Sequence, residues 1–300
     1  MEHLTGNTYF SPSKGPSIGG YLVKDQLLLI DTGLDDSSVR KAIRDFSDID
    51  VAYIFNTHSH ADHCGGNAYI QKQYTAHTFA PELEATFIEQ PVLEPIYLYG
   101  SCPLTFMKNK YTMAKPSKVH QHLHTSGPFT IEFDGKPHRF QLLKLPGHSP
   151  NMMGIVTPDQ IAFLGDALIS DEAIEKHPLI FTYDVADHLK TLEQLEKLDA
   201  KGYIIAHGGY YTHIDHLIAS NRNVLIRTQN YLIDRLHRGS YTIEELHAHI
   251  TEVYRLEETP LQYSLNHSVI KAHLSTLEKQ GKVSITVTAG NLKFTAEPGA

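Results

Sequence analysis

Residues 56–67 read NTHSHADHCGGN and place three histidines and an aspartate within six positions. His58 and His60 are two residues apart, so on an extended segment their side chains point the same way. Asp62 and His63 follow where the chain is expected to turn into a helix. This one short segment can therefore supply ligands to two neighbouring metal ions.

Polar residues follow apolar strands at several other places in the chain. The run VAYIF comes directly before the histidine motif, RFQLLKL precedes His148, QIAF precedes Asp166, and GYII precedes His207. A buried carboxylate such as that of Asp166 is costly unless it is paired or bound to a metal. A solvated histidine-rich loop at 56–67 would not explain why metal-ligand residue types also follow apolar strands elsewhere in the chain. The candidate metal ligands are His58, His60, Asp62, His63, His148, Asp166 and His207.

Imidazole and carboxylate ligands suit zinc and also iron or manganese. The chain has only two cysteines, Cys64 and Cys102, which argues against a closed structural zinc site and against a disulfide framework. Cys64 lies beside the motif, but we interpret it as a small buried residue rather than a further ligand. Gly65 and Gly66 follow it and are expected to let the start of the helix lie close to the metals.

The alternating histidines of VHQHLH (119–124) are expected on one solvated strand face. A second metal site there is the less favoured alternative, because no acidic residue lies close in sequence.

The composition is that of a soluble protein. With 34 acidic against 26 basic residues in 300, nothing global favours a nucleic-acid backbone or an anionic membrane as partner. The N-terminus MEHLTGNTYF lacks the pattern of a signal peptide, and no apolar run reaches the roughly 18–20 residues that cross a bilayer. We expect a cytoplasmic protein without membrane contact, whereas its oligomeric state stays open.

Hydrophobic periodicity and turn residues predict alternating strands and helices over most of the chain. Strands are expected at 7–12, 19–25, 26–33, 51–55, 128–133, 139–147, 152–157, 160–166 and 202–209. Helices are expected at 35–46, 67–74, 81–90, 184–198 and 216–239, where Gly239 ends the last one. Residues 91–118 show no periodicity and are interpreted as an irregular insertion, a candidate cover over a pocket.

The pattern changes beyond Gly239. Two helical stretches, TIEELHAHITEV and SLNHSVIKAHLSTLEKQGKV, are followed by the alternating ribbon ITVTAGNLKFT, which is the outline of a winged helix-turn-helix. We therefore predict two domains, residues 1–238 and 239–300.

The ligand pattern resembles that of the metallo-β-lactamase superfamily, with HxHxDH at 58–63 followed by His148, Asp166 and His207 in the order of that family. The resemblance covers about residues 5–215. It implies an α/β (α+β) fold, the four-layer αββα sandwich, with the site along one edge of the two sheets.

The resemblance also implies how the ligands divide between two metal ions. One ion would take His58, His60 and His148, the other Asp62, His63 and His207, and Asp166 would bridge them. Two divalent ions, with zinc first and iron or manganese as alternatives, can share a water and lower its pKa enough to supply hydroxide near neutral pH. Asp62 is the candidate catalytic residue, orienting that water or accepting its proton, although a ligating carboxylate is a weak base.

The substrate class is narrowed by comparison within the family. Zinc β-lactamases that resemble this sequence commonly have cysteine in place of Asp166, whereas glyoxalase II-like and RNA-processing branches use aspartate. Diiron redox members typically have glutamate in place of His60, so hydrolysis is favoured, with a persulfide dioxygenase as an alternative. We expect hydrolysis of an ester, thioester or similar bond in a small-molecule substrate.

The C-terminal region raises two alternative functions. It resembles the winged helix of the β-lactamase-like endoribonucleases, which predicts single-stranded RNA cleavage as the second option. A third is a non-enzymatic winged-helix DNA-binding regulator with a ligand-sensing metal domain. From Ser240 to Ala300, however, seven glutamates outnumber five lysine and arginine residues, which disfavours duplex DNA because phosphate neutralisation dominates that affinity.

Overall fold

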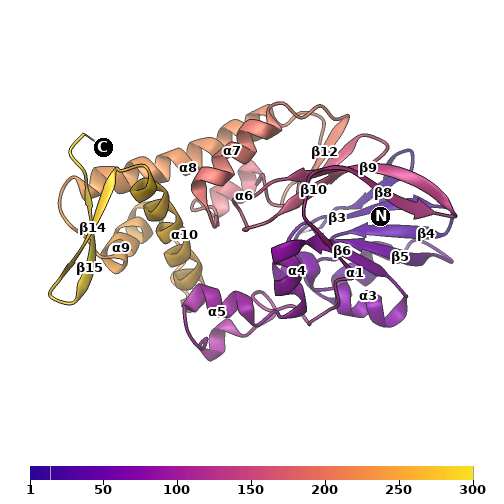
Figure 1. Cartoon of the computed structure of the whole chain (residues 1–300), viewed down its shortest axis with the longest axis horizontal. Helices are drawn as coiled ribbons and strands as arrows, with labels where there is room; N and C mark the ends of the chain where they lie inside the picture. Colours follow the sequence, from indigo (N-terminus) through magenta and orange to yellow (C-terminus); the bar gives the residue numbers. More distant parts are fainter. Residues whose placement is uncertain (14, 300) are drawn as a thin grey trace.

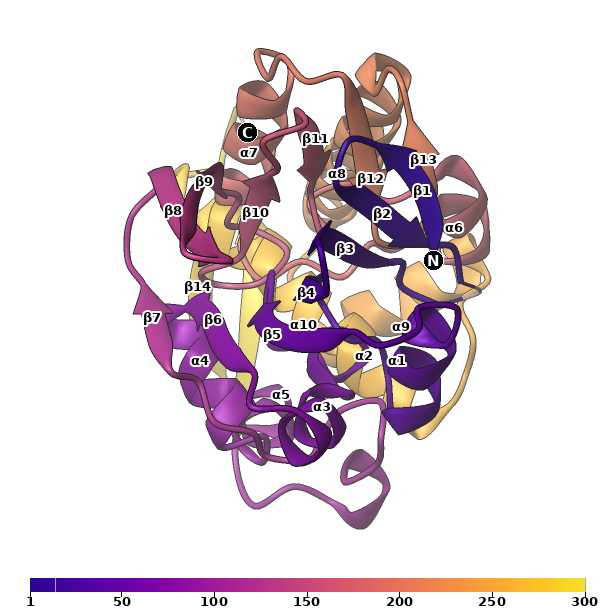
Figure 2. The same cartoon turned by 90° about the vertical axis from the view of Figure 1, so that its right-hand side faces the viewer.

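A computed structural model describes residues 1–13 and 15–299. Two β-sheets pack face to face with helices on their outer sides, and a mainly helical C-terminal region lies at the opposite end of the molecule (Figure 1). This arrangement confirms the expected mixed α/β sandwich. Figure 2 shows the strands of both sheets in front of the C-terminal helices.

The first sheet has seven strands in sequence order. They are β1 (Glu2–Thr5), β2 (Thr8–Ser11), β3 (Ile18–Val23), β4 (Gln26–Ile30), β5 (Asp50–Phe55), β6 (His77–Pro81) and β7 (Gln121–Leu123). The pairs from β1 to β4 are antiparallel, and those from β4 to β7 are parallel. The carboxyl ends of β4, β5 and β6 therefore lie at one edge of the sheet.

The second sheet has the order β13-β12-β11-β10-β9-β8. Its strands are β8 (Gly127–Phe133), β9 (Lys136–Lys144), β10 (Met153–Val156), β11 (Ile161–Phe163), β12 (Gly202–Ile205) and β13 (Gly209–Tyr211). The strands β8 to β11 form the expected antiparallel meander, and β12 returns parallel to β11. Because β11 and β12 are parallel, Asp166 and His207 follow the same end of neighbouring strands.

Three layers of apolar side chains hold the sandwich together. Residues of both sheets, including Tyr21, Phe133 and Phe163, form the core between them. On the outer face of the first sheet pack α1 (Asp36–Ile43) and α3 (Asn67–Gln73), through residues such as Val39 and Ile70. The outer face of the second sheet is covered by α7 (Val185–Leu195) and the first half of α8 (Asp215–Leu236).

The C-terminal region consists of α9 (Ile243–Tyr254), α10 (Pro260–Lys279) and the hairpin of β14 (Val283–Thr288) and β15 (Asn291–Ala296). Thr242 begins α9 with a capping box that includes Glu245, as its sequence favours. The core of this region also includes Leu232 and Leu236 from the end of α8. The helix, helix and hairpin follow one another as expected, whereas the winged-helix class and the boundary at residue 238 stay predictions.

Several sequence expectations differ from the structure. Residues 91–118 are not wholly irregular, because they contain α5 (Leu93–Tyr99) and a 3₁₀ turn (Thr105–Met107), both of which contact α10. The strands β1 and β6 and the helix α6 (Asp171–Lys176) were not expected; they are all short. The remaining helices are α2 (Ala61–Cys64) and α4 (Glu82–Glu89). Among the described residues, no helix is both long and apolar enough to cross a bilayer.

Candidate metal centre

The histidine motif lies where β5 leaves the first sheet. Its backbone passes through Asn56 and Thr57 and turns into α2 at Ala61. The amide of Thr32, just after β4, donates to the carbonyl of His63 (2.8 Å), so the motif is tied to the neighbouring strand end.

The glycines after the motif serve contacts within the chain. A Cβ on Gly65 would lie 2.0 Å from the carbonyl oxygen of Leu34, and one on Gly66 would lie 2.6 Å from that of Thr32. These glycines therefore allow α2 and α3 to pack closely on the 32–34 loop. The expectation that they also let the start of the helix lie close to the metals stays a prediction.

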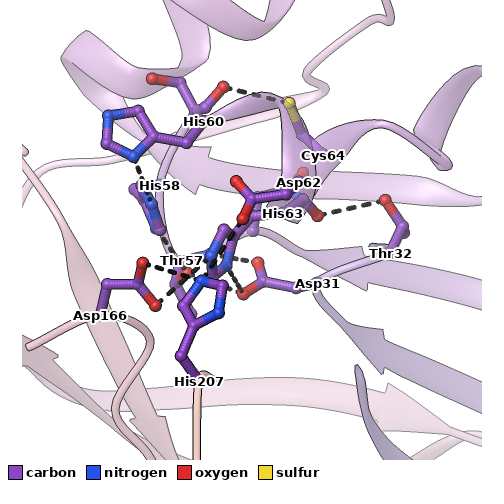
Figure 3. Close-up of polar contacts among 12 residues, drawn as sticks. Asp31, Thr32, Thr57, His58, His60, Asp62, His63, Cys64, Asp166 and His207 are labelled. Atoms are coloured by element: carbon purple, nitrogen blue, oxygen red, sulfur yellow. Dashed lines mark hydrogen bonds and ion pairs between the residues drawn. The ribbon is translucent and has the colours of Figure 1, made fainter. Parts of the chain in front are cut away.

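The structure brings all seven candidate ligands together at the edge of the sandwich. Figure 3 labels all of them except His148. They fall into three groups, and within each group the ligand atoms lie within 4.8 Å of one another. The groups are His58, His60 and His148; His58, His63 and Asp166; and Asp62, His63 and His207. These segments are far apart in sequence, so only the fold assembles the cluster. The described residues contain no other group of this kind.

In the first group three ring nitrogens face one another. Nδ1 of His60 lies 3.1 Å from Nε2 of His58 and 3.0 Å from Nε2 of His148. The other ring nitrogen of His148 lies 3.1 Å from the carbonyl oxygen of Phe181, and that of His58 lies 3.0 Å from the hydroxyl of Thr57. With Nδ1 of His148 donating to that carbonyl, its Nε2 directs a lone pair at the centre of the group.

Asp166 connects the other ligands. Its two carboxylate oxygens lie 3.4 Å from Nε2 of His63, 3.5 Å from Nε2 of His148 and 3.4 Å from Nε2 of His207. A carboxylate between two histidine groups is the position that a bridging ligand requires. Nε2 of His207 also lies 3.3 Å from Oδ2 of Asp62.

The donor set fits divalent metal ions. Nε2 of His63 and Oδ1 of Asp166 are buried and have no hydrogen-bond partner among the described residues. Buried polar atoms are normally satisfied, so an orphaned nitrogen and oxygen 3.4 Å apart point to an ion between them. The three converging nitrogens of the first group lead to the same conclusion, because one Nδ1 proton cannot satisfy both of its neighbours.

Asp31 is a functional residue that the sequence reasoning missed. Its Oδ2 lies 2.8 Å from Nδ1 of His63, and its two oxygens accept hydrogen bonds from the amide and hydroxyl of Thr57, each at 2.8 Å. The Asp31 carboxylate therefore holds a proton on Nδ1 of His63, so that Nε2 becomes the ligand atom once its own proton is lost. The rule that a polar residue at a strand end marks the site applies to Asp31, because it directly follows β4.

Glu84, in the first turn of α4, was missed as well. This buried carboxylate accepts from the amide and hydroxyl of Ser59 (3.1 and 2.6 Å), from the hydroxyl of Ser149 (2.7 Å) and from the amide of Asn151 (2.9 Å). Ser59 lies between His58 and His60, and Ser149 follows His148. No strand end or motif marks Glu84 in the sequence, so only the packing of α4 reveals it.

The protonation states reflect the crowding of charges. Although burial opposes it, the Asp166, Asp31 and Asp62 carboxylates raise the pKa of His63 well above its usual value. The Asp166 charge raises the pKa of His207 to about 10. Burial lowers the pKa of His148 to about 3 and that of His58 well below its usual value.

Asp62 remains ionised in this environment. Burial raises its pKa, but the charges of His63 and His207 outweigh that effect and lower it to about 2. Such a carboxylate is a weak base, which favours an orienting over a proton-accepting role. The catalytic role of Asp62 remains a prediction.

A cavity of about 400 Å³ opens from the cluster toward the C-terminal region. One end is formed by His148, Asp166 and His207, and the other by residues of α10 and of the segment before it. Residues 91–118 do not line this cavity, so the predicted cover is instead provided by residues 173–181 and 255–269.

The other residues singled out in the sequence have ordinary structural roles. Cys64 is buried, and its thiol donates to the carbonyl of Ser59 (3.2 Å), in agreement with packing. The three histidines at 120–124 are exposed, as expected, but only 121–123 form a strand. His120 stacks on His77, and Nδ1 of His124 lies 3.0 Å from a carboxylate oxygen of Glu82.

The chain belongs to the metallo-beta-lactamase superfamily, whose family model matches residues 20–207. Members of this superfamily are usually hydrolases and usually bind divalent metals. A comparison with curated protein sequences finds no match.

Solved structures share the fold at low sequence identity. A metallo-beta-lactamase family protein from Thermus thermophilus has a TM-score of 0.71 and 19% identity, covering 97% of this chain and 99% of that one. A beta-lactamase domain protein from Burkholderia ambifaria has a TM-score of 0.72 and 16% identity, covering 98% and 93%. An archaeal superfamily protein from Sulfolobus tokodaii has a TM-score of 0.53 and 16% identity, covering 92% and 100%. The first two similarities extend over nearly the whole chain, including its C-terminal region.

Proposed function

We propose that this protein is a hydrolase that uses two divalent metal ions, zinc first, to cleave an ester or thioester in a small molecule. The convergence of the seven candidate ligands around the buried atoms of His63 and Asp166 that lack a hydrogen-bond partner carries this proposal. His58, His60 and His148 would hold one ion, and Asp62, His63 and His207 the other, with Asp166 between them.

The chemistry divides between the ions and the chain. When bound, two divalent ions supply hydroxide near neutral pH and polarise the attacked carbonyl. Hydrolysis adds water across the bond: the carbonyl carbon gains an oxygen, and the alkoxide or thiolate leaves and takes up a proton. Asp62 orients the attacking water, while Asp31 and Glu84 keep the histidines in place through His63, Ser59 and Ser149.

The cavity supports a small-molecule substrate. Its volume of about 400 Å³ lies within the range of roughly 300–1,000 Å³ that is usual for small-ligand sites. Its wall includes Leu179, Ile180 and Phe181, which suit an apolar acyl or alcohol group. This is the substrate type of a glyoxalase II-like branch, which we place first.

RNA cleavage is the second candidate and rests on the order of elements after residue 238. The charge balance of that region opposes it. The hairpin exposes Ile285, Val287 and Leu292, where a nucleic-acid-binding wing would carry cations.

Two measurements test the proposal. Elemental analysis of the purified protein should give about two divalent ions per chain, and the double variant His63→Ala with Asp166→Ala should lose both metal and turnover. Rates on a panel of thioesters, aryl esters, lactones, phosphodiesters and short RNAs should show the highest kcat/KM for a thioester or ester. Turnover of RNA alone would replace the first candidate with the second, and a metal-free active protein would refute both.

A further inference from the structure

The cavity beside the metal cluster is lined by residues of different chemical kinds. Its lining includes ligands of the cluster and two cations, Lys176 at the end of α6 and Arg255 just after α9. Neither cation forms an ion pair with another residue in the part of the chain that the structure describes. Two unpaired cations facing one cavity are available to a negatively charged ligand.

The position of Arg255 is fixed by its backbone. It is the C-cap of α9 and has φ +52°, a left-handed conformation that is uncommon outside glycine. The amide of the next residue, Leu256, donates to the carbonyl of Thr251 (3.1 Å), which completes the helix end. This turn directs the chain from α9 along the cavity, so that Arg255, Leu256 and Glu257 all line it.

Asn266 provides a second, independent observation. Its side chain is on α10, lines the same cavity and is only 7% exposed. Its amide has no hydrogen-bond partner among the described residues. The amide is not among the fully buried atoms that lack a partner, so it is open to solvent and available to a polar group that enters the cavity.

Apolar side chains also line the cavity. They are Ile169, Leu179, Ile180, Phe181, Leu256, Leu265 and Val269. The cavity therefore combines ligands of the metal cluster, an apolar wall and two cations.

We propose that the C-terminal region is a substrate-recognition element, and that the cavity takes an acyl compound whose apolar chain ends in a carboxylate or another anion. This inference rests on the proposed hydrolase function and specifies its substrate class. The scissile carbonyl lies at the metal cluster, the chain lies along the apolar wall, Asn266 bonds a polar group of the chain, and Arg255 with Lys176 binds the terminal anion. Glu257 also lines the cavity, but a single carboxylate does not cancel two cations.

The kinetic test compares two esters of equal chain length. Para-nitrophenyl hexanoate is neutral, whereas the mono-para-nitrophenyl ester of adipic acid ends in a carboxylate. We expect the metal-loaded full chain to favour the anionic ester in kcat/KM. In Arg255→Gln the ratio of the two kcat/KM values should fall roughly tenfold, mainly through KM, because a charge-assisted contact is lost. Arg139→Gln is the matched control, since Arg139 is an exposed arginine on β9 outside the cavity.

A binding test separates this inference from the proposed function. Line broadening in NMR measures how monomethyl adipate and the neutral methyl hexanoate bind to the metal-loaded chain, whether or not either ester is hydrolysed. The inference is supported if monomethyl adipate binds more tightly than methyl hexanoate and if this difference disappears in Arg255→Gln. That result supports it even if no ester is hydrolysed and the hydrolase proposal fails. Equal binding of the two probes overturns it. So does an anion preference that survives in Arg255→Gln, because the carboxylate would then be bound by the metal ions.

The variant Asn266→Leu tests the role of the amide, because it should strengthen the binding of a probe whereas Arg255→Gln should weaken it. Leucine has a similar volume and replaces the amide with an apolar surface, so the variant should bind methyl hexanoate more tightly than the wild type does. Weaker binding of this apolar probe would show that Asn266 does not face the ligand.

Discussion

The hydroxyl of Ser149 donates a hydrogen bond of 2.7 Å to Glu84, although 65 positions separate the two residues. The other oxygen of the same carboxylate accepts from the hydroxyl of Ser59 (2.6 Å). One buried side chain therefore joins the loop of His58 and His60 to the loop of His148. The spacing of the first ligand group depends on this connection.

Glu84→Gln should weaken that connection. The glutamine amide would present hydrogens to donors that now meet an oxygen, so we expect a loss of about 2–4 kcal/mol in the free energy of unfolding. Metal affinity should fall along with it. Chemical denaturation and metal titration measure both quantities. Glu82→Gln, an exposed change on the same helix, is the control and should leave both unchanged.

Asp31→Asn should lower metal affinity with less effect on the fold. Asparagine has only one oxygen that can accept the Nδ1 proton of His63, and it carries no negative charge. The ring is then held less firmly with Nε2 toward the ion. Loss of such a supporting partner typically costs about 10–100-fold in metal affinity. Competition with a chromophoric chelator gives this value. Asp25→Asn, at an exposed turn, is the comparison, and an equal loss there would contradict the assigned role of Asp31.

Metal binding should release protons at neutral pH. The carboxylates hold the pKa of His63 well above its usual value and that of His207 at about 10, so both rings are protonated near pH 7 in the metal-free chain. Each must lose its proton to bind an ion. Calorimetric titration with zinc in buffers of different ionisation enthalpy should show proton release and weaker binding as the pH falls. Binding without proton release would show that these two rings are not ligands.

His273 of α10 should make folding stability depend on pH. Burial lowers its pKa to about 3, far below the usual value of about 6.5. Between these values the unfolded chain binds a proton that the folded chain does not, so stability is complete above about pH 6.5 and decreases as the pH falls toward 3.

The variant His273→Leu isolates this contribution. Its unfolding free energy should decline less steeply below about pH 6.5, by up to about 1.4 kcal/mol per pH unit. Denaturation curves at several pH values measure the slope. His122→Leu, an exposed change, should keep the wild-type slope, and identical slopes for the wild type and His273→Leu would refute the assignment.

The sequence predicted the centre of the molecule well because local pattern and chemistry coincide there. Apolar runs of strand length located β5, β9, β11 and β12, and the residues that follow them, such as His148 and Asp166, do lie together. Strand ends collect at one edge of a sandwich, so the order of ligands along the chain was enough to expect a cluster. That these residues bind metal remains a prediction.

Features that depend on tertiary contact were not predictable in the same way. Glu84 lies in a short helix with no motif, and its hydrogen bonds reach residues 25 and 65 positions away. The strand β1 has four residues, too few to show a clear alternation. In residues 91–118 the helix α5 contacts α10, and Glu94 is buried in it, so its sequence lacks the regular polar face of a surface helix.

The helix α8 contributes to two cores at once. Its first half packs on the second sheet through Leu217 and Ile218, and its last turns contribute Leu232 and Leu236 to the C-terminal region. A chain cut after residue 238 would expose the side chains of Leu232 and Leu236 to solvent. We expect copies of the shortened chain to self-associate through these two side chains. The sandwich and the C-terminal region therefore share one helix, and a chimera that exchanges the C-terminal region should take its junction at the middle of α8.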